Sequence, residues 1–309
     1  MKVYSNIEEF EPKENLVATV GTFDGVHLGH SYILDCLKTE SEKMNGESVL
    51  LTFYPHPRMV LFPENNELKM LNTQEEKIQL LDQSNLNHLI IHPFTREFSR
   101  LNSVEFVRDV LVNQLGISKL IIGYDHHFGR NREGTFEDLL ELANLYGFEV
   151  EQIEAQEFKD TQVSSTKIRS AIEAGDMKTA RHFLGYPFLL SGIVVQGAGI
   201  GRTLGFKTAN IGIKDRFKII PPNGVYAVHV NIKGQSYKGM LNIGVRPSIN
   251  DSGGRTIEVH IFGLDEDLYG LEISVGLLDK IREEKKFENI DLLKQQLELD
   301  KAKCEDILY

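Results

Sequence analysis

Cysteine is scarce in this sequence, since Cys36 and Cys304 are the only two among 309 residues. Two cysteines this far apart do not form a disulfide framework and lack the spacing of a zinc site. Cys36 falls in a helical pattern, where a free cysteine usually packs as a small apolar residue. We therefore expect a protein of a reducing compartment, the cytoplasm.

Long apolar runs and an excess of basic residues are also missing. No stretch reaches the roughly 18 apolar residues of a membrane span, and the N-terminus shows no apolar core of signal-peptide length. The net charge is −11, whereas proteins that coat nucleic acid or anionic membranes usually carry a basic excess. These absences predict no nucleic-acid and no membrane partner. A phosphate ligand remains possible, because one helix N-terminus and one cation can hold it.

The hydrophobic rhythm changes near residue 184, so length and pattern together predict two domains, residues 1–184 and residues 185–309. In the first, apolar runs alternate with amphipathic helical stretches, which indicates an α/β fold with a doubly wound parallel sheet. The expected strands are residues 16–20, 49–53, 88–92, 119–123 and 148–153. With the strand order 3-2-1-4-5, the loops after the first and fourth strands open into one crevice at the switch point.

Two expected helices of this domain carry capping signals. The stretch 103–116 has Ser103 as its predicted N-cap, and the stretch 134–147 has Thr135 and Asp138 at capping-box spacing.

The second domain is mainly β, because closely spaced strand patterns with turn signals between them indicate an antiparallel barrel or sandwich. The expected strands are residues 192–197, 205–213, 224–230, 236–244, 256–263 and 272–278. A helix over residues 289–308, capped by Asn289, is expected to cover the barrel. Its apolar candidates for that contact are Ile290, Leu293, Leu297 and Ala302.

The loop GTFDGVHLGH, residues 21–30, follows the first strand. Its glycines are entropically costly, which suggests a close approach of the backbone to something. The residues from His27 to His30 open a helix, whose N–H groups and positive dipole end attract an anion, and Gly29 leaves room for it. The two imidazoles are expected to donate hydrogen bonds to phosphate oxygens during transfer. Two solvent-facing histidines at a turn, or a metal pair, remain alternatives.

Two further segments of the first domain are candidates for ligand contacts. The loop GYDHHFGRNREGT, residues 123–135, follows the fourth strand and so lies at the expected switch point. The segment SSTKIRSAIEAGD, residues 164–176, places hydroxyls before a helix that carries Arg169 in its first turns. It is either an ordinary N-cap with a surface arginine or a second phosphate clamp. The hydroxyls of that clamp are those of Ser164, Ser165 and Thr166.

The segment GIVVQGAGIGRTLGFKTAN, residues 192–210, opens the second domain with a glycine-rich loop. Its N–H groups can wrap a polyphosphate, although no Gly-Lys-Ser/Thr follows and it is not a P-loop. Thr208 and Asn210 share one face of an extended segment, and their oxygens suit Mg²⁺. The loop residues concerned are Gly197, Gly199, Gly201, Arg202 and Gly205.

Glu258 lies in the strand pattern TIEVHIFG, where apolar residues alternate with it. Alternation puts it with His260 on the face opposite Ile257, Val259 and Ile261. That face is either solvent or the interior of an open barrel, where the carboxylate can accept a proton from a substrate hydroxyl.

Taken in order, these motifs resemble the bifunctional bacterial riboflavin kinase and FAD synthetase family over nearly the whole chain. The resemblance implies a Rossmann-like nucleotidyltransferase domain followed by an antiparallel flavokinase β-barrel with a C-terminal helix. The matching stretches are GTFDGVHLGH, TFYPHPRMVL, GYDHHFG with Gly134, SSTKIRSAIEAGD, GIVVQGAGIGRTLGFKTANI, NGVYAV, NIGVRPSI, EVHIF with DLYG, and IREEKKF.

In the second half, the resemblance implies that ATP with Mg²⁺ phosphorylates riboflavin to FMN. Thr208 and Asn210 would hold the metal, Glu258 would be the general base, and Arg246 would contact the flavin. The loop over the ATP phosphates would include Gly197, Gly199, Gly201 and Arg202. Phosphoryl transfer needs little from the protein beyond position and charge neutralisation.

In the first half, the resemblance implies that the FMN phosphate attacks the α-phosphorus of a second ATP, so that FAD and pyrophosphate form. His27 and His30 match the catalytic signature of such adenylyltransferases, and Asp125 and Phe128 fall in the loop associated with the flavin. The implied ATP and phosphate contacts are Gly21, Phe23, Asp24, Gly29, Ser164, Ser165, Thr166 and Arg169.

Two positions depart from the family pattern. Lys207 replaces the usual proline before Thr208, which gives up a fixed φ or adds a phosphate contact. His126 stands where an aromatic residue is common after Asp125, which puts flavin stacking there in doubt. Two alternatives remain: one active half with an inert partner, or a flavin-binding sensor without turnover. We expect a monomer or a weak homo-oligomer.

Overall fold

The computed structural model describes residues 1–65, 67–124, 127–153, 163–197, 205–245 and 255–308. The chain forms two compact units that do not follow the sequence order strictly. The first unit contains Met1–Leu68 and Lys77–Ser164, and the second contains Lys69–Glu76 and Ser165–Tyr309. A short segment of the N-terminal half therefore belongs to the second unit.

The first unit is built on a six-stranded parallel sheet of order β1-β4-β3-β2-β5-β6. Its strands are β1 (Lys2–Tyr4), β2 (Leu16–Val20), β3 (Ser48–Tyr54), β4 (His88–Pro93), β5 (Ile117–Gly123) and β6 (Glu149–Ile153). All five predicted strands are present, and their order confirms the expected switch point between the first and the fourth. The short edge strand β1 was not predicted.

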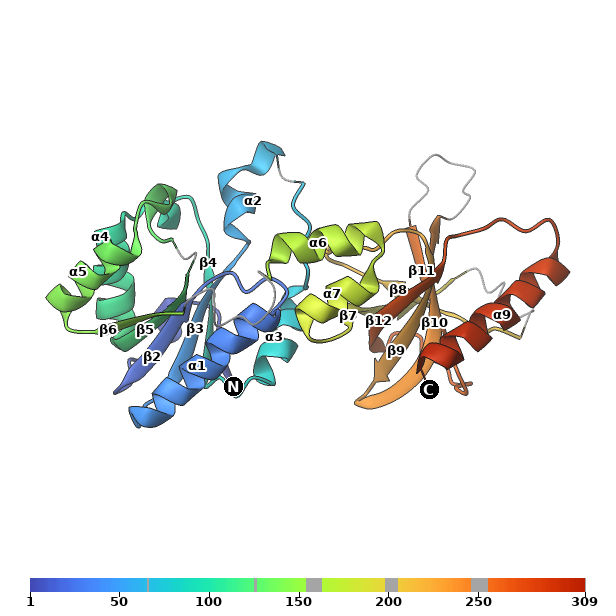
Figure 1. Cartoon of the computed structure of the whole chain (residues 1–309), viewed down its shortest axis with the longest axis horizontal. Coiled ribbons are helices and arrows are strands. Elements are labelled where there is room, and N and C mark those ends of the chain that lie inside the picture. Colours follow the sequence, from blue (N-terminus) through green and yellow to red (C-terminus); the bar gives the residue numbers. More distant parts are fainter. Residues whose placement is uncertain (66, 125–126, 154–162, 198–204, 246–254, 309) are drawn as a thin grey trace. The chain divides into compact units, whose positions relative to one another are not determined.

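Helices cover both faces of this sheet (Figure 1). Alternate residues of each strand point to opposite faces, which gives two separate apolar layers. Helices α1 (Leu28–Lys43) and α3 (Gln74–Asp82) pack on one face through Leu34, Leu37 and Leu81. Helix α5 (Phe136–Tyr146) and the π-helix Phe106–Leu115, which continues α4 (Ser103–Glu105), pack on the other. Helix α2 (Pro57–Leu61) follows β3.

One of the two predicted caps is confirmed and the other is wrong. Thr135 and Asp138 form the expected capping box, with the Asp138 N–H donating to Thr135 Oγ1 at 3.2 Å. Asn102, not Ser103, caps the next helix, because its Oδ1 accepts from the Glu105 N–H at 2.8 Å. Glu105 closes that box by accepting from the Asn102 N–H at 3.0 Å.

The second unit contains a closed antiparallel barrel of order β10-β11-β8-β7-β12-β9. This confirms the predicted β-barrel. The strands are β7 (Phe188–Val195), β8 (Ala209–Gly212), β9 (Gly224–Ile232), β10 (Gln235–Val245), β11 (Arg255–Ile261) and β12 (Glu272–Arg282). Helices α6 (Ser165–Ala174) and α7 (Met177–Leu184) belong to the same unit.

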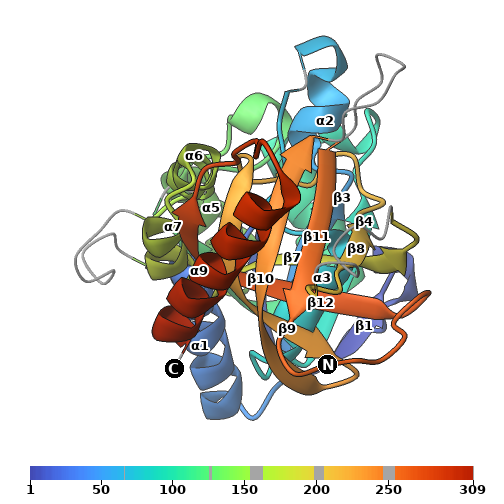
Figure 2. The ribbon, with the colours of Figure 1, turned by 90° about the vertical axis from the view of Figure 1, so that its right-hand side faces the viewer.

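The C-terminal helix α9 (Ile290–Leu308) lies across the barrel (Figure 2). Asn289 caps it as predicted, accepting from the Leu292 N–H at 2.9 Å. The predicted contacts of Ile290 and Ala302 are wrong, since Ile290 is 67% exposed and Ala302 also faces solvent. The buried face instead recurs every three or four residues, so Ala302 points away from it. That face carries Leu297, Asp300, Cys304 and Leu308.

Candidate active sites

The loop after β2 brings its two histidines together at the start of α1. His27 is the N-cap of α1, and its Nδ1 accepts from the His30 N–H at 3.3 Å. Accepting there places the proton of a neutral His27 ring on Nε2. The two imidazoles stack with centroids 3.7 Å apart, and Phe23 stacks on His30 at 4.5 Å. His27 is only 6% exposed, which rules out the alternative of a solvent-facing pair.

The backbone of this loop is strained. Phe23 has a φ of +48° and Val26 a φ of +34°. Non-glycine residues rarely adopt positive φ, least of all a β-branched valine, and such strain concentrates at functional sites. Gly21 is also constrained, since a Cβ there would meet the Phe23 ring at 3.1 Å.

His30 is neutral at neutral pH. Burial, the neighbouring His27 and the charge of Lys77 hold the pKa of the His30 imidazole well below its ordinary value. Its Nδ1 is buried and has no hydrogen-bond partner within the described ranges. In the same ranges, no group of three His, Cys, Asp or Glu side chains is placed to hold a metal ion.

Lys77 is a residue of this cluster that the sequence analysis missed. It lies on α3, is 5% exposed, and donates through Nζ to the Thr22 carbonyl oxygen at 3.2 Å. Asp24 is 2% exposed and acts on the same ammonium. The sequence held one sign of its burial. Lys77 lies four residues before the apolar Leu81 in a helical pattern, which puts both on the same face of the helix.

The structure describes only part of the predicted flavin loop, residues 123–135. Asp125 and His126 lie outside the described residues. Phe128 is buried in the core next to Phe106, with ring centroids 6.3 Å apart. A Cβ at Gly134 would strike the Phe128 ring at 2.6 Å, so this glycine allows the ring to pack. Whether Phe128 contacts the flavin stays a prediction.

The residues of the predicted second phosphate clamp are divided between the two units. Ser164 ends the first unit, whereas Ser165, Thr166 and Arg169 belong to the second with α6. Arg169 donates through Nε to the Lys69 carbonyl oxygen at 2.7 Å. It is therefore anchored to the backbone of residues 69–76, and the predicted clamp stays a prediction.

In the barrel, the predicted metal and base residues meet at neighbouring strands. Thr208 comes directly before β8, and its hydroxyl lies 3.2 Å from Glu258 Oε2. Asn210 of β8 pairs with Glu258 of β11, which pairs in turn with Asn242 of β10. Residues directly opposite in a sheet share one face, so three polar side chains form a row across three strands. Glu258 is half-buried in this row.

Asn242 and Glu284 are members of this face that the sequence analysis missed. A Cβ at Gly244 would lie 2.3 Å from Glu284 Oε1 and 3.2 Å from Asn242 Nδ2, which brings both side chains to the same surface. Glu284 also accepts from Asn223 Nδ2 at 2.9 Å. The strand pattern gives Asn242 the same alternation as Glu258, which is the signal that could have found it.

Gly197 is the described member of the glycine-rich loop that touches this site. A Cβ at Gly197 would lie 2.0 Å from Asn210 Nδ2, so only glycine allows this backbone to approach the amide. Four further predicted contacts, Gly199, Gly201, Arg202 and Arg246, lie outside the described residues.

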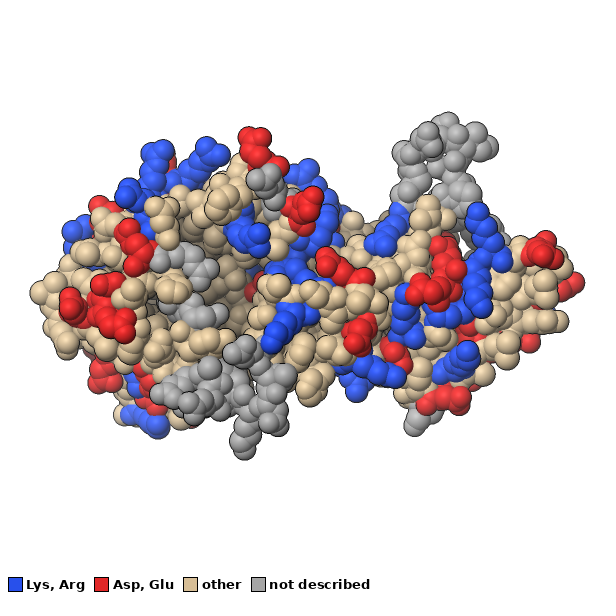
Figure 3. All heavy atoms as spheres, turned by 45° about the horizontal axis from the view of Figure 1, so that its top comes forward, with Lys and Arg blue, Asp and Glu red and all other residues tan. Residues whose placement is uncertain are grey.

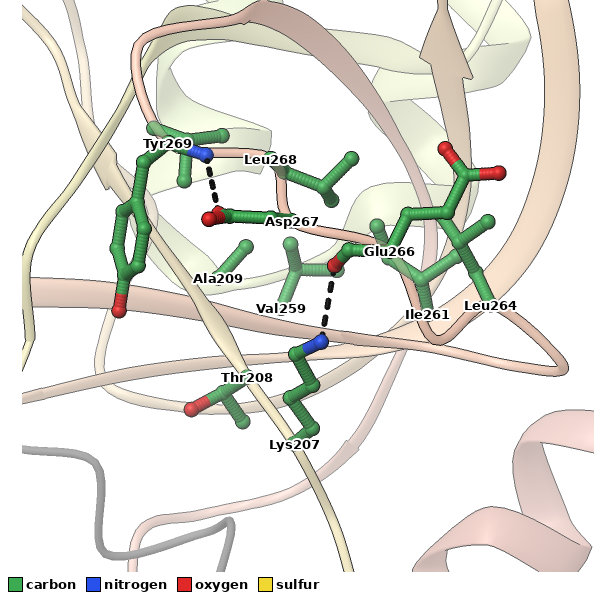
Figure 4. A pocket seen from close by; sticks show the side chains of 11 residues that line it. Lys207, Thr208, Ala209, Val259, Ile261, Leu264, Glu266, Asp267, Leu268 and Tyr269 are labelled. Carbon is green, nitrogen blue, oxygen red and sulfur yellow. Dashed lines mark hydrogen bonds between the residues drawn. The ribbon is translucent and has the colours of Figure 1, made fainter.

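A pocket next to Thr208 is lined mainly by apolar side chains (Figure 4). Lys207 bounds it and donates through Nζ to Asp265 Oδ1 and to the Glu266 carbonyl oxygen, both at 2.9 Å. The His260 ring donates from Nδ1 to the Lys207 carbonyl oxygen at 2.8 Å. Lys207 thus fastens the segment before Thr208 to the loop after β11, and the flexibility expected from losing proline is restrained.

Comparisons with known proteins match each half of the chain to a family. Residues 9–167 match the family model of FAD synthetase, and residues 184–308 match that of riboflavin kinase. The chain belongs to the family of bifunctional riboflavin kinase/FMN adenylyltransferases. The resemblance drawn from the sequence motifs is confirmed.

The relatives match over nearly their full length. The protein of that name from Pseudomonas fluorescens is 35% identical over 98% of this chain and 96% of its own. Those from Escherichia coli K12 and Bacillus subtilis are 37% and 33% identical, covering 94% and 95% of this chain and 91% and 93% of their own.

A solved structure matches over nearly the whole chain. The crystal structure of a protein described as a macrolide-efflux protein, from Streptococcus pneumoniae, has a TM-score of 0.87 at 31% identity and covers 97% of each chain. In the present chain, none of the helices that the structure describes has the length and apolar character needed to cross a membrane.

Proposed function

We infer that this chain carries out both reactions of its family, the phosphorylation of riboflavin to FMN and the adenylylation of FMN to FAD, each with ATP. The observation that carries the kinase assignment is the contact of Thr208 with Glu258 beside Asn210. We further propose residues 1–184 and 185–309 as the two functional domains.

In the barrel, Glu258 accepts the proton of the 5′-hydroxyl of riboflavin. The oxygen then bonds to the γ-phosphorus of ATP, the bond from that phosphorus to the β-phosphate oxygen breaks, and ADP leaves. The row of Asn210, Glu258 and Asn242 fixes where the hydroxyl can lie, and positioning is the main contribution of a protein to this chemistry.

The residues Thr208 and Asn210 fit Mg²⁺. Both offer hard, neutral oxygen ligands, and the closeness of Gly197 to Asn210 leaves the amide no room to turn toward the loop. Two such ligands leave several coordination positions for phosphate oxygens and water, as Mg²⁺ prefers. When bound, the ion would neutralise charge on the ATP phosphates.

The apolar pocket beside Thr208 suits the base of ATP. Ala209, Val259 and Leu268 supply an apolar lining, and Tyr269 stands at its edge with 56% of its surface exposed. A flat aromatic base gains from such a lining, while its phosphates reach toward Thr208.

In the first unit, a phosphate oxygen of FMN attacks the α-phosphorus of ATP, and the bond to the β-phosphate breaks with release of pyrophosphate. His27 and His30 donate hydrogen bonds to the phosphate oxygens as charge builds up, at the positive end of α1. The clamp of Ser164, Ser165, Thr166 and Arg169 is proposed to hold the remaining phosphates.

These reactions also suggest the compartment and the partners of the protein. Since both steps consume ATP, we propose the cytoplasm, and as partners riboflavin, FMN and ATP, without nucleic acid or membrane. Acidic and basic side chains are interspersed on the visible face of the second unit (Figure 3). We propose a monomer or a weak homo-oligomer.

The test is a time course of FMN and FAD, separated by chromatography, from riboflavin, ATP and Mg²⁺. Glu258→Gln should abolish FMN formation but keep FAD formation from supplied FMN. His30→Ala should do the reverse. Glu272→Gln makes the same chemical change on an exposed barrel position and should alter neither step. Loss of both activities in each active-site variant would contradict two independent sites.

A further inference from the structure

The ammonium of Lys77 is hydrogen-bonded to the backbone at the start of the loop that carries the two histidines, residues 21–30. Its Nζ lies 3.2 Å from the Thr22 carbonyl oxygen and 3.5 Å from Thr52 Oγ1, and Thr52 Oγ1 donates to the same carbonyl at 3.2 Å. Thr52 is fully buried on β3. The ammonium therefore ties the loop after β2 to the neighbouring strand, just before the strained residues that lead to His27.

This cluster holds unused hydrogen-bonding capacity. An ammonium has three donors, and Lys77 has two acceptors among the described residues. His30 Nδ1 is buried and has no hydrogen-bond partner among the described residues. A buried polar atom without a partner is costly and calls for an explanation. One such atom, beside a buried ammonium with a spare donor at the same helix N-terminus, indicates a ligand that completes both.

The charges in the cluster come from three elements. Lys77 belongs to α3, His27 and His30 to α1, and Asp24 to the loop after β2. Burial lowers the pKa of Lys77 to about 8 although Asp24 raises it. At neutral pH the cluster thus combines one ammonium, one carboxylate and a neutral His30.

We propose that Lys77 is a positioning residue of the adenylyltransferase site, which fixes the Thr22–Asp24 turn and supplies positive charge beside His30 for the phosphates of ATP. This inference rests on the adenylyl transfer proposed above. Negative phosphate oxygens favour the ammonium form, so ATP binding and protonation of Lys77 are linked.

The first experiment compares three variants in FMN adenylylation, with FMN and ATP supplied. Lys77→Met should raise the KM for ATP about tenfold, because a charge-assisted interaction is lost. Lys77→Arg keeps the charge and should recover most of that loss. Lys119→Met is the matched control, since Lys119 is 8% exposed in the same unit but bonds to Glu40 and Glu151. It should leave the KM unchanged, and the heat inactivation of FAD formation reports the folding of the first unit in every variant.

The second experiment measures how kcat/KM for ATP depends on pH. A purely structural role of Lys77 would not change this dependence. Lys77 loses its charge as the pH rises through about 8, so kcat/KM for ATP should fall above that pH in the wild type. Lys77→Arg should lack this alkaline limb. Because the Lys77 charge lowers the pKa of His30, an NMR titration should show that pKa rising in Lys77→Met.

The outcomes separate this inference from the proposed function. If the wild type forms no FAD, or if His30→Ala forms it normally, the proposed adenylyltransferase site is wrong. If His30→Ala loses FAD formation while Lys77→Met keeps the wild-type KM and pH profile, only the role of Lys77 is overturned. A Lys77→Met effect that Lys119→Met reproduces would also overturn it.

Discussion

At the scale of residues, a few close contacts fix the positions of Asn210 and Thr208 in the barrel site. Asn210 has Gly197 on one side and Glu258 on the neighbouring strand, and the nearest approach leaves no room for a methyl group. Thr208 is held through its hydroxyl by Glu258, and through the preceding Lys207 by the loop after β11. A small substitution next to either proposed metal ligand can therefore displace it.

Gly197→Ala should sharply reduce FMN formation. The new methyl would lie 2.0 Å from Asn210 Nδ2 and 2.6 Å from its Cγ, so the amide must shift. A displacement of about 1 Å in a positioning group can cost on the order of a hundredfold in rate. The measurement is kcat of riboflavin phosphorylation at varied Mg²⁺.

Gly234→Ala is the control for this substitution. Gly234 lies in the turn between β9 and β10 with open space around it and a φ of +82°, so alanine adds strain without touching Asn210. An equal loss of kcat in the two variants would mean that general destabilisation, not displacement of Asn210, explains the effect.

At the scale of elements, a buried ion pair adds to the apolar contacts that attach α9 to the barrel. Arg282 of β12 donates through Nε and Nη2 to Asp300 at 2.9 and 2.7 Å, and Gln296 donates to Asp300 Oδ1 at 2.9 Å. Asp300 is fully buried. Burial and the Asp300 carboxylate also raise the pKa of Cys304 to about 12, which keeps this thiol protonated and apolar.

Asp300→Asn should destabilise the second unit by about 3 kcal/mol, because breaking a buried pair leaves an uncompensated guanidinium. Heat inactivation of riboflavin phosphorylation gives the measurement, and the exposed Asp291→Asn in the first turn of α9 is the control. Unchanged heat stability in Asp300→Asn would show that water or a rearranged α9 compensates Arg282.

Elements were more predictable than their contacts. The periodicity of apolar residues predicted all five internal strands of the first sheet, because parallel strands buried on both faces read as apolar runs. It missed β1, which is only three residues long, and placed Ile290 and Ala302 on the wrong face of α9. The sequence did not predict the buried position of Lys77, because a lysine in a helical pattern is usually exposed. Only the folded structure brings it to its acceptors, Thr22 and Thr52.

At the scale of the whole molecule, the two halves of the sequence are not two independent units. Residues 69–76 come from the half that matches FAD synthetase but belong to the barrel unit. Met70 donates to the Phe217 carbonyl oxygen at 2.7 Å, and Lys218 donates to Glu76 Oε2 at 2.5 Å. No sequence pattern predicts this attachment, because it joins residues more than a hundred positions apart.

Glu76→Gln should therefore weaken the kinase although it lies in the other half. Glu76 and Lys218 side chains are both fully buried, and Glu76 Oε1 also accepts from the Ser191 N–H at 2.8 Å. Removing the carboxylate charge deprives the buried Lys218 ammonium of the counter-charge of Glu76, at a cost of about 3 kcal/mol. Replacing both partners by apolar residues, as in Glu76→Leu with Lys218→Met, should restore much of that loss.

The two activities of one chain provide the readout for Glu76. Heat should inactivate riboflavin phosphorylation of Glu76→Gln at a lower temperature, while FAD formation from supplied FMN keeps its wild-type inactivation temperature. Glu75→Gln changes the exposed neighbour and should shift neither. If both activities of Glu76→Gln fall together, residues 69–76 support the first unit as much as the second. If neither falls, the buried pair contributes nothing that a neutral amide cannot replace.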